Sequence, residues 1–173
     1  MRRAFAYVVD WYLASVFASL PVLLIYSMES GNTNAPSSLA EMSISGGVTA
    51  GILAIFLTSI YYVVIPTKVN KGQTLGKKLL SIKVVNNDGS DVNLFTMIKR
   101  ELLGVMIIEG ALVCSGDYFR QIIHMFTSDN IYGIIVKLGL IVSIASIAIM
   151  LISKEKRMIH DIIGNTKVIE IEK

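Results

Sequence analysis

Cysteine and histidine are scarce in this chain. Its 173 residues include one cysteine, Cys114, and two histidines, His124 and His160. A single cysteine excludes an internal disulfide, and neither histidine has a partner at the spacing of metal ligands. We therefore expect no metal site.

Charged residues are also few. They make up 17% of the chain, whereas soluble domains contain about a quarter. Hydrophobic residues make up 53%, and the mean hydropathy is +0.62. This composition argues against a soluble domain and favours a single membrane domain over residues 1–173. The basic residues flank apolar segments, as they do in membrane proteins, so we expect no nucleic-acid partner.

Two short motifs that would suggest an enzyme fail on chemical grounds. Gly72–Lys78 resembles a phosphate-binding loop, but its glycines are too close together and Lys78 stands where Ser or Thr is needed. His160 and Asp161 have no placed nucleophile with which to form a triad. We expect neither an enzyme nor a bound cofactor.

Four apolar segments are long enough to cross a bilayer as helices, which takes about 20 residues. The predicted spans are Ala4–Tyr26, Ile44–Ile65, Leu94–Ser115 and Ile131–Ile152. Leu94–Ser115 is the weakest, because charged residues interrupt it. The first run is longer than the core of a signal peptide and contains Asp10, so we interpret it as a span.

The basic residues set the orientation. With four crossings, every Lys and Arg except Arg120 and Lys137 falls on one side. These residues are Arg2, Arg3, Lys68, Lys71, Lys77, Lys78, Lys83, Lys99, Arg100, Lys154, Lys156, Arg157, Lys167 and Lys173. Because positive loops stay inside, we predict an all-α, four-helix bundle in the bacterial plasma membrane. Both termini, the loop 66–93 and the tail 153–173 would then be cytoplasmic.

The cytoplasmic segments contain strand patterns. Leu79–Val85 and Asp91–Phe95 flank the turn signal Asp88-Gly89, which predicts a β-hairpin. The tail segment Thr166–Ile171 alternates polar and apolar residues, with one break in the period. We expect it to add a third strand, because an isolated hairpin is only marginally stable.

Acidic residues inside predicted spans need partners or a function. Asp10 lies in the first span, two helical turns from Arg3 and on nearly the same face. Arg100 and Arg157 flank later spans at a similar depth, and Asp161 follows in the tail. We predict a cytoplasmic-side cluster of Arg3, Asp10, Arg100 and Asp161. It would act either as a structural staple or as a proton or cation site.

Glu109 is the second intramembrane acid and lies near the predicted midplane. Lys137 in the last span is close enough in depth to pair with it. Alternatively, Lys137 extends toward the outer surface while Glu109 is protonated or faces a polar neighbour. Both readings make Asp10, Glu109 and Lys137 candidate ion-handling residues.

Gly47 and Gly51 form a Gly-x-x-x-Gly pattern on the second span. Small residues at this spacing let another helix approach closely. We expect packing inside the monomer, with homodimerisation as the alternative.

Three stretches together resemble the RDD family of small bacterial membrane proteins. They are Arg3-x-x-Ala6-x-x-x-Asp10, then Gly72-Gln73-Thr74-Leu75-Gly76-Lys77 with Asp88-Gly89 and Arg100 behind it, and Arg157-Met158-Ile159-His160-Asp161 with Thr166 and Val168. The resemblance implies that Arg3, Asp10 and Asp161 are the residues that give the family its name. It also implies about three helices and a link to ion exchange.

Two functions are consistent with these features. The first is a small transporter, or a component of one, that handles sodium ions or protons through its buried acids. The second is a non-catalytic accessory, regulatory or immunity-type protein that binds another membrane component. The lysines of the loop 66–93 would contact anionic lipid at the cytoplasmic face in either case, and a homo-oligomer or a membrane-protein partner is compatible with both.

Overall fold

Three long apolar helices form the body of the structure, a computed structural model that describes residues 2–171. Each is long and apolar enough to cross a membrane, and each contains one of the predicted spans. They are α1 (Arg2–Ser30), α2 (Ile44–Ser59) continued by the wider π-helical turns of η2 (Ile60–Val69), and α6 (Asp129–Ile152). The second helix continues through Pro66, although the predicted span ended at Ile65.

The predicted span 94–115 is broken rather than continuous. Its first part consists of α4 (Leu94–Ile98) and the π-helical η3 (Lys99–Glu109), and α5 (Cys114–His124) follows at an angle of 57°. Gly110 ends η3 with a φ of 33°, a left-handed conformation that glycine adopts without strain. The helices therefore supply three crossings, or four if this bent pair is one span.

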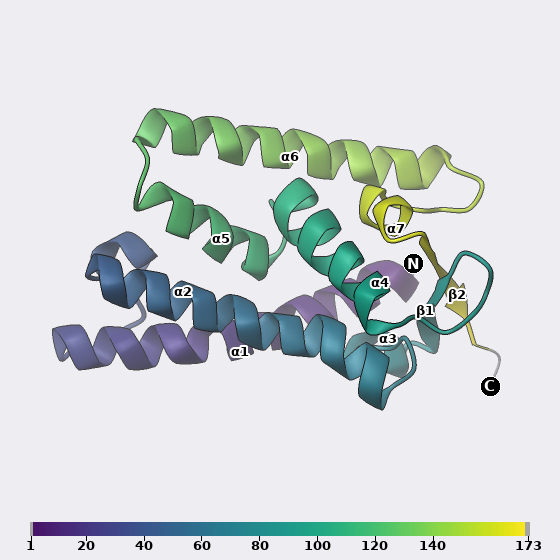
Figure 1. The fold of residues 1–173 in the computed structure, drawn as a ribbon, viewed down its shortest axis with the longest axis horizontal. Helices are drawn as coiled ribbons and strands as arrows, with labels where there is room; N and C mark the ends of the chain where they lie inside the picture. Colours follow the sequence, from purple (N-terminus) through teal and green to yellow (C-terminus); the bar gives the residue numbers. More distant parts are fainter. Residues whose placement is uncertain (1, 172–173) are drawn as a thin grey trace.

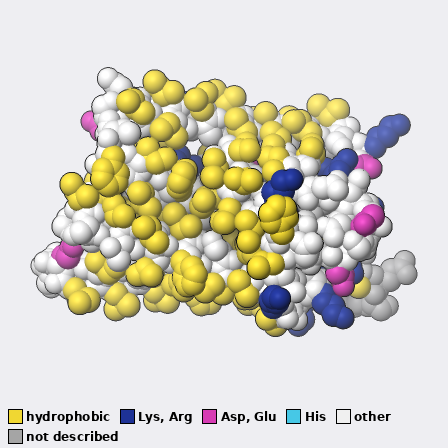
Figure 2. All heavy atoms as spheres, viewed as in Figure 1, with side chains coloured by type: hydrophobic (Ala, Val, Ile, Leu, Met, Phe, Trp, Pro, Cys, Tyr) yellow, Lys and Arg dark blue, Asp and Glu magenta, His cyan; other side chains and the backbone are white. Residues whose placement is uncertain are grey.

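The chain runs back and forth between two ends of an elongated bundle (Figure 1). The start of α1, the short helices α3 (Leu75–Leu79) and α7 (Ile159–Ile163), and both β-strands lie at one end. The α5–α6 connection lies at the other, near η1 (Leu39–Glu41). Lys, Arg, Asp and Glu side chains gather mainly at the first end in Figure 2, and we call it the polar end.

A two-stranded antiparallel sheet joins the loop and the tail at the polar end. β1 (Ile82–Asn86) pairs with β2 (Thr166–Glu170), with Val84 opposite Val168. The predicted tail strand is therefore present, but the predicted hairpin partner 91–95 is wrong. Only an isolated bridge joins Val85 to Asp91, because Asn93 caps α4 and the chain turns helical at Leu94.

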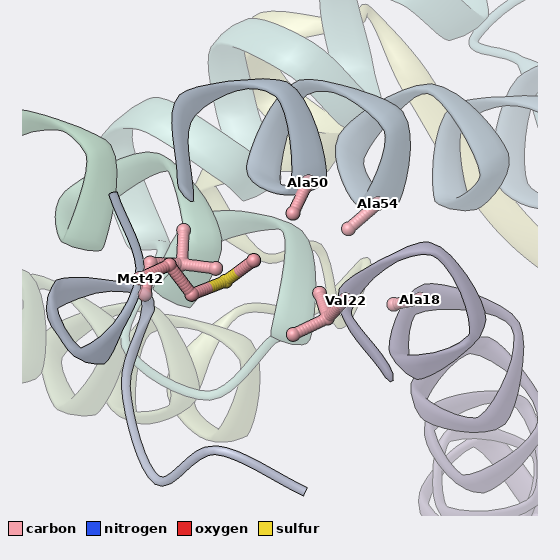
Figure 3. Packing of buried hydrophobic residues seen from close by; sticks show 6 residues of the cluster. Ala18, Val22, Met42, Ala50 and Ala54 are labelled. Carbon is pink, nitrogen blue, oxygen red and sulfur yellow. The ribbon is translucent and has the colours of Figure 1, made fainter. Parts of the chain in front are cut away.

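A core of small residues lies between α1 and α2, toward the end opposite the sheet. Figure 3 shows Ala18 and Val22 of α1 facing Ala50 and Ala54 of α2, with Met42 beside them. Together with Leu39 these residues form what we call the apolar core.

Gly47 and Gly51 serve packing within the chain. A Cβ atom at Gly47 would lie 2.7 Å from Met125 Cε and 2.8 Å from the Leu39 carbonyl oxygen. At Gly51 it would lie 2.8 Å from Ile122 Cδ1. The Gly-x-x-x-Gly face is therefore occupied by η1 and by α5 and the turn after it.

Candidate functional site

Asp10 is buried in a network of hydrogen bonds from two other segments. Its Oδ1 accepts the Tyr61 hydroxyl at 2.6 Å and the Gly76 N–H at 2.8 Å, and its Oδ2 accepts the Thr74 hydroxyl at 2.5 Å. Lys77 Nζ lies 3.6 Å from Oδ2. This Asp10 network ties α1 to η2 and to α3. The predicted cluster is wrong for Asp10, which within residues 2–171 forms no hydrogen bond or ion pair with Arg3, Arg100 or Asp161.

The sequence of the segment before β1 explains how α3 reaches Asp10. Thr74 caps α3 by accepting the Lys77 N–H, while its hydroxyl also donates to Asp10. Gly76 must be glycine, because a Cβ atom there would lie 2.6 Å from the Ala6 carbonyl oxygen. Burial lowers the pKa of the Lys77 ammonium, and the charge of Asp10 opposes that shift.

Asp161 holds a second network at the centre of the polar end. Arg3 Nη2 donates to its Oδ2 at 2.6 Å, and Arg100 Nη2 donates to its Oδ1 at 2.9 Å. The Met158 N–H donates to Oδ2 at 3.1 Å, and Arg100 also bonds Glu101. This Asp161 network joins the tail to α1 and η3.

The charges around Asp161 outweigh its burial. Burial alone would raise the pKa of this carboxyl, but the charges of Arg100, His160 and Arg3 hold the pKa well below its ordinary value. Arg157, predicted to lie nearby, instead pairs with Glu155 at 2.6 Å. The structure therefore brings Arg3, Arg100 and Asp161 together and leaves Arg157 outside.

Glu109 forms a third network with α6 and the tail. Its Oε1 accepts the Ser146 hydroxyl at 2.7 Å and the His160 N–H at 2.8 Å, and its Oε2 lies 2.9 Å from His160 Nδ1. The predicted Glu109–Lys137 pair is wrong: Lys137 is exposed and in no ion pair within residues 2–171. The alternative, a polar neighbour for Glu109, is what the structure contains.

Sequence reasoning missed His160 as the partner of Glu109. The only available signal was its place in the Arg157–Asp161 motif, directly beside Asp161. It missed Tyr61 and Thr74 as well, because a tyrosine in an apolar run and a threonine in a loop are each unremarkable alone.

A cavity of about 320 Å³ connects the three networks. Charged or titratable members of each network line it: Asp10 and Lys77, Arg3 and Arg100, Glu109 and His160. Apolar side chains of α1, η3 and α6 make up other parts of its wall, among them Ala4, Val105, Ile147 and Met150. We call this cavity and its three networks the polar site. A buried polar site in an apolar bundle distinguishes this molecule from a simple membrane anchor.

The carboxylates of the networks outnumber their lysine and arginine side chains by one. Asp10, Glu101, Glu109 and Asp161 face Arg3, Lys77 and Arg100. One negative charge is therefore left over unless His160 carries a proton. A low-dielectric site does not tolerate an unbalanced charge, so a proton or another cation must balance it.

Two further features concern ligand binding. Within residues 2–171 no group of three or more His, Cys, Asp or Glu side chains is placed to hold a metal ion. Arg120, on α5, is buried, and its Nε has no hydrogen-bond partner in that range. The nearest carboxylate recorded for it is Asp117, at 3.6 Å.

Long apolar helices around a buried polar site define a multi-pass membrane protein. The model of the RDD family matches residues 1–165, so the chain belongs to the RDD family, and the resemblance of its three motifs is confirmed. The chain is also similar to the uncharacterized protein YckC of Bacillus subtilis strain 168. The two are 28% identical over 153 residues, which cover 88% of this chain and 74% of that protein. No solved structure matches this chain.

Proposed function

We propose that this RDD family protein is a small transporter, or a component of one, that handles sodium ions or protons in the plasma membrane. The single observation that carries the proposal is the surplus carboxylate around the cavity. A site with one uncompensated negative charge binds a monovalent cation and is neutral when occupied. Intramembrane acids that face a cavity are typical of proton and ion pathways.

We further propose that the polar end faces the cytoplasm. The clustering of lysine and arginine there supports this orientation, because positive segments are retained inside. The chain has one cysteine, so a Cys114→Ser variant with a new cysteine at Asn87 reports the side directly. A membrane-impermeant thiol reagent added to intact cells should leave position 87 unmodified. Modification from outside would show that the polar end faces the cell exterior.

Flux measurements test the transport proposal. Protein reconstituted in vesicles should move sodium ions or protons down an imposed gradient. Glu109→Gln should reduce the rate at least tenfold, because the amide cannot carry the surplus charge. Asp129→Asn is the matched control, since Asp129 is an exposed acid on α6 far from the cavity. Equal rates in the wild type and Glu109→Gln would contradict the proposal.

A second candidate is a non-catalytic accessory, regulatory or immunity-type protein. It is supported by two exposed features of the loop between η2 and α4: the turn at Asn87–Ser90, and the side chains of Lys68, Lys71 and Lys78. Such a surface suits a membrane-protein partner or a second copy of this chain, as well as anionic lipid. Gentle purification from native membranes should then retain a stoichiometric partner, and an isolated chain with full flux would exclude this role as the main one.

A further inference from the structure

His160 stands between two carboxylates that come from different elements. Its Nδ1 lies 2.9 Å from Glu109 Oε2, and its Nε2 lies 3.5 Å from Asp161 Oδ1. A neutral imidazole carries one N–H, so its other nitrogen presents a lone pair to a carboxylate. A doubly protonated ring presents an N–H and a positive charge toward both carboxylates. The geometry therefore holds a place for one additional proton.

The contact between α7 and η3 at this point is unusually close. A Cβ atom at Gly104 would lie 2.7 Å from His160 Cβ and 2.8 Å from its Cα. Around the same spot Glu109 Oε1 accepts the His160 N–H, and Ser146 Oγ accepts the Ile159 N–H at 2.9 Å. The first turn of α7 is therefore seated directly on η3 and α6, and a small movement of His160 breaks these contacts.

The other charges around His160 balance one another. Arg3 from α1 and Arg100 from η3 face Asp161 from α7, and Arg100 also pairs with Glu101 of η3. The neighbouring α6 contributes the uncharged Ser146. Two cations and two carboxylates are thus matched, which leaves Glu109 with His160 as its counter-charge.

We propose that His160 and Glu109 bind one proton between them, and that this proton fastens α7 onto η3 as the wall of the cavity at the polar end. Met158 and His160 both line the cavity, so α7 forms part of its boundary. When the proton leaves to water, His160 loses the positive charge that faces the Glu109 carboxylate, the contact between α7 and η3 weakens and the cavity opens on this side. The inference deepens the proposed function by naming what regulates the site, and it rests on that function only for what passes through the cavity.

The two histidines make a direct test practicable. Full-length protein with isotope-labelled histidine in lipid nanodiscs gives two sets of ring signals, and His124→Gln identifies those of His160. We expect the His160 signals to be those of a doubly protonated ring while the shared proton is bound, and those of a singly protonated ring once it has left. With the proton gone, backbone amides 159–163 should exchange with solvent roughly tenfold faster or more, after correction for the intrinsic effect of pH, because the hydrogen bond to Glu109 loses the charge of its donor.

Two variants separate the proton from simple packing. In Glu109→Gln we expect a singly protonated ring at neutral pH and exchange in 159–163 that is fast and independent of pH. Gly104→Ala keeps every charge and displaces His160, so exchange should be fast at every pH. Gly133→Ala is the control for adding a methyl group to a helix, because a Cβ atom there would lie more than 4 Å from every other described segment, and it should match the wild type.

The wild-type measurement decides the proposal even where a variant fails to accumulate. A His160 ring that stays singly protonated between about pH 5 and 9 would overturn it, as would a titrating ring with no change in amide exchange at 159–163. None of these signals requires flux. Vesicles without sodium or proton movement would therefore count against the transport proposal alone.

Discussion

The apolar core and the polar site are equally buried, yet they are built from opposite chemistry. Ala18, Ala50 and Ala54 are 0% exposed, and Asp10 and Asp161 are 1% and 0% exposed. Within a bilayer, apolar side chains gain little from leaving lipid, so helices associate through close contact between small residues. The core follows this rule and joins two helices that are neighbours in sequence.

The polar site fixes two short helices against the long ones. α3 and α7 have five residues each, too few to be stable helices by themselves. Asp10 positions the first and Glu109, Arg3 and Arg100 position the second. The apolar core therefore sets how α1 and α2 pack, whereas the paired charges set where α3 and α7 attach. A second apolar cluster holds β1 and β2 at the polar end, and it consists of Val63, Val84, Val92 and Met97 with Val168 packed against them.

The largest effect should come from Asp161→Asn. It leaves Arg3 and Arg100 buried without their shared carboxylate, and removing one partner of a buried ion pair costs about 3–5 kcal/mol. The free energy of unfolding in mild detergent, measured by denaturant titration, checks this. Ala50→Gly in the apolar core should cost only about 1 kcal/mol. Similar losses for both variants would abolish the distinction between the two regions.

Tyr61→Phe should have the next largest effect. It removes the hydroxyl that donates to Asp10 and keeps the ring, and a hydrogen bond to a charged group contributes about 1.5–3 kcal/mol. Tyr12→Phe is the control, because Tyr12 is 63% exposed. The same unfolding experiment should separate the two variants. If Tyr12→Phe costs as much, the contribution of Tyr61 does not come from Asp10.

Acid should destabilise the polar end selectively. The pKa of Asp161 is lower in the folded protein than in the unfolded chain. Its carboxylate therefore stabilises the fold above the unfolded pKa of about 4, and this contribution is lost as the pH falls toward the folded pKa. Unfolding measured at decreasing pH should show the loss in the wild type. Asp161→Asn should lack that part of the slope, and an unchanged slope would contradict the assignment.

The smallest effect should come from Asp91→Asn. Asp91 pairs with Lys83 at 3.4 Å, but its side chain is 54% exposed. Exposed ion pairs contribute less than about 1 kcal/mol, so the free energy of unfolding should hardly change. A large loss of stability in Asp91→Asn would mean that exposed charges at the polar end stabilise the fold as much as the buried ones do.

The long helices could be predicted because bilayer thickness imposes a minimum apolar length, which the runs around Ala14, Ala54 and Ile144 meet. The break after Glu109 could not be predicted so readily. Residues 110–115 are apolar or small and continue the hydrophobic run, and the break is visible only in the positive φ of Gly110 and the departure of α5.

The polar site was predictable in its acids and not in its partners. An acid such as Asp10 or Glu109 in an apolar run can be recognised from the sequence alone, because burying its charge in a membrane costs free energy. The partner of Glu109 is His160, which follows α6 in the chain. The depth of Glu109 in its predicted span had indicated Lys137 instead. The hairpin prediction erred because the segment 91–95 turns helical at Leu94, so β1 pairs with the tail strand instead.

Proton release tests the surplus negative charge of the polar site directly. Purified protein in weakly buffered detergent at neutral pH is mixed with sodium chloride, and choline chloride serves as the control. We expect up to one proton released per chain with sodium, none with choline, and none from Glu109→Gln. Wild-type protein that releases no proton with sodium would contradict the claim that one site accepts either cation.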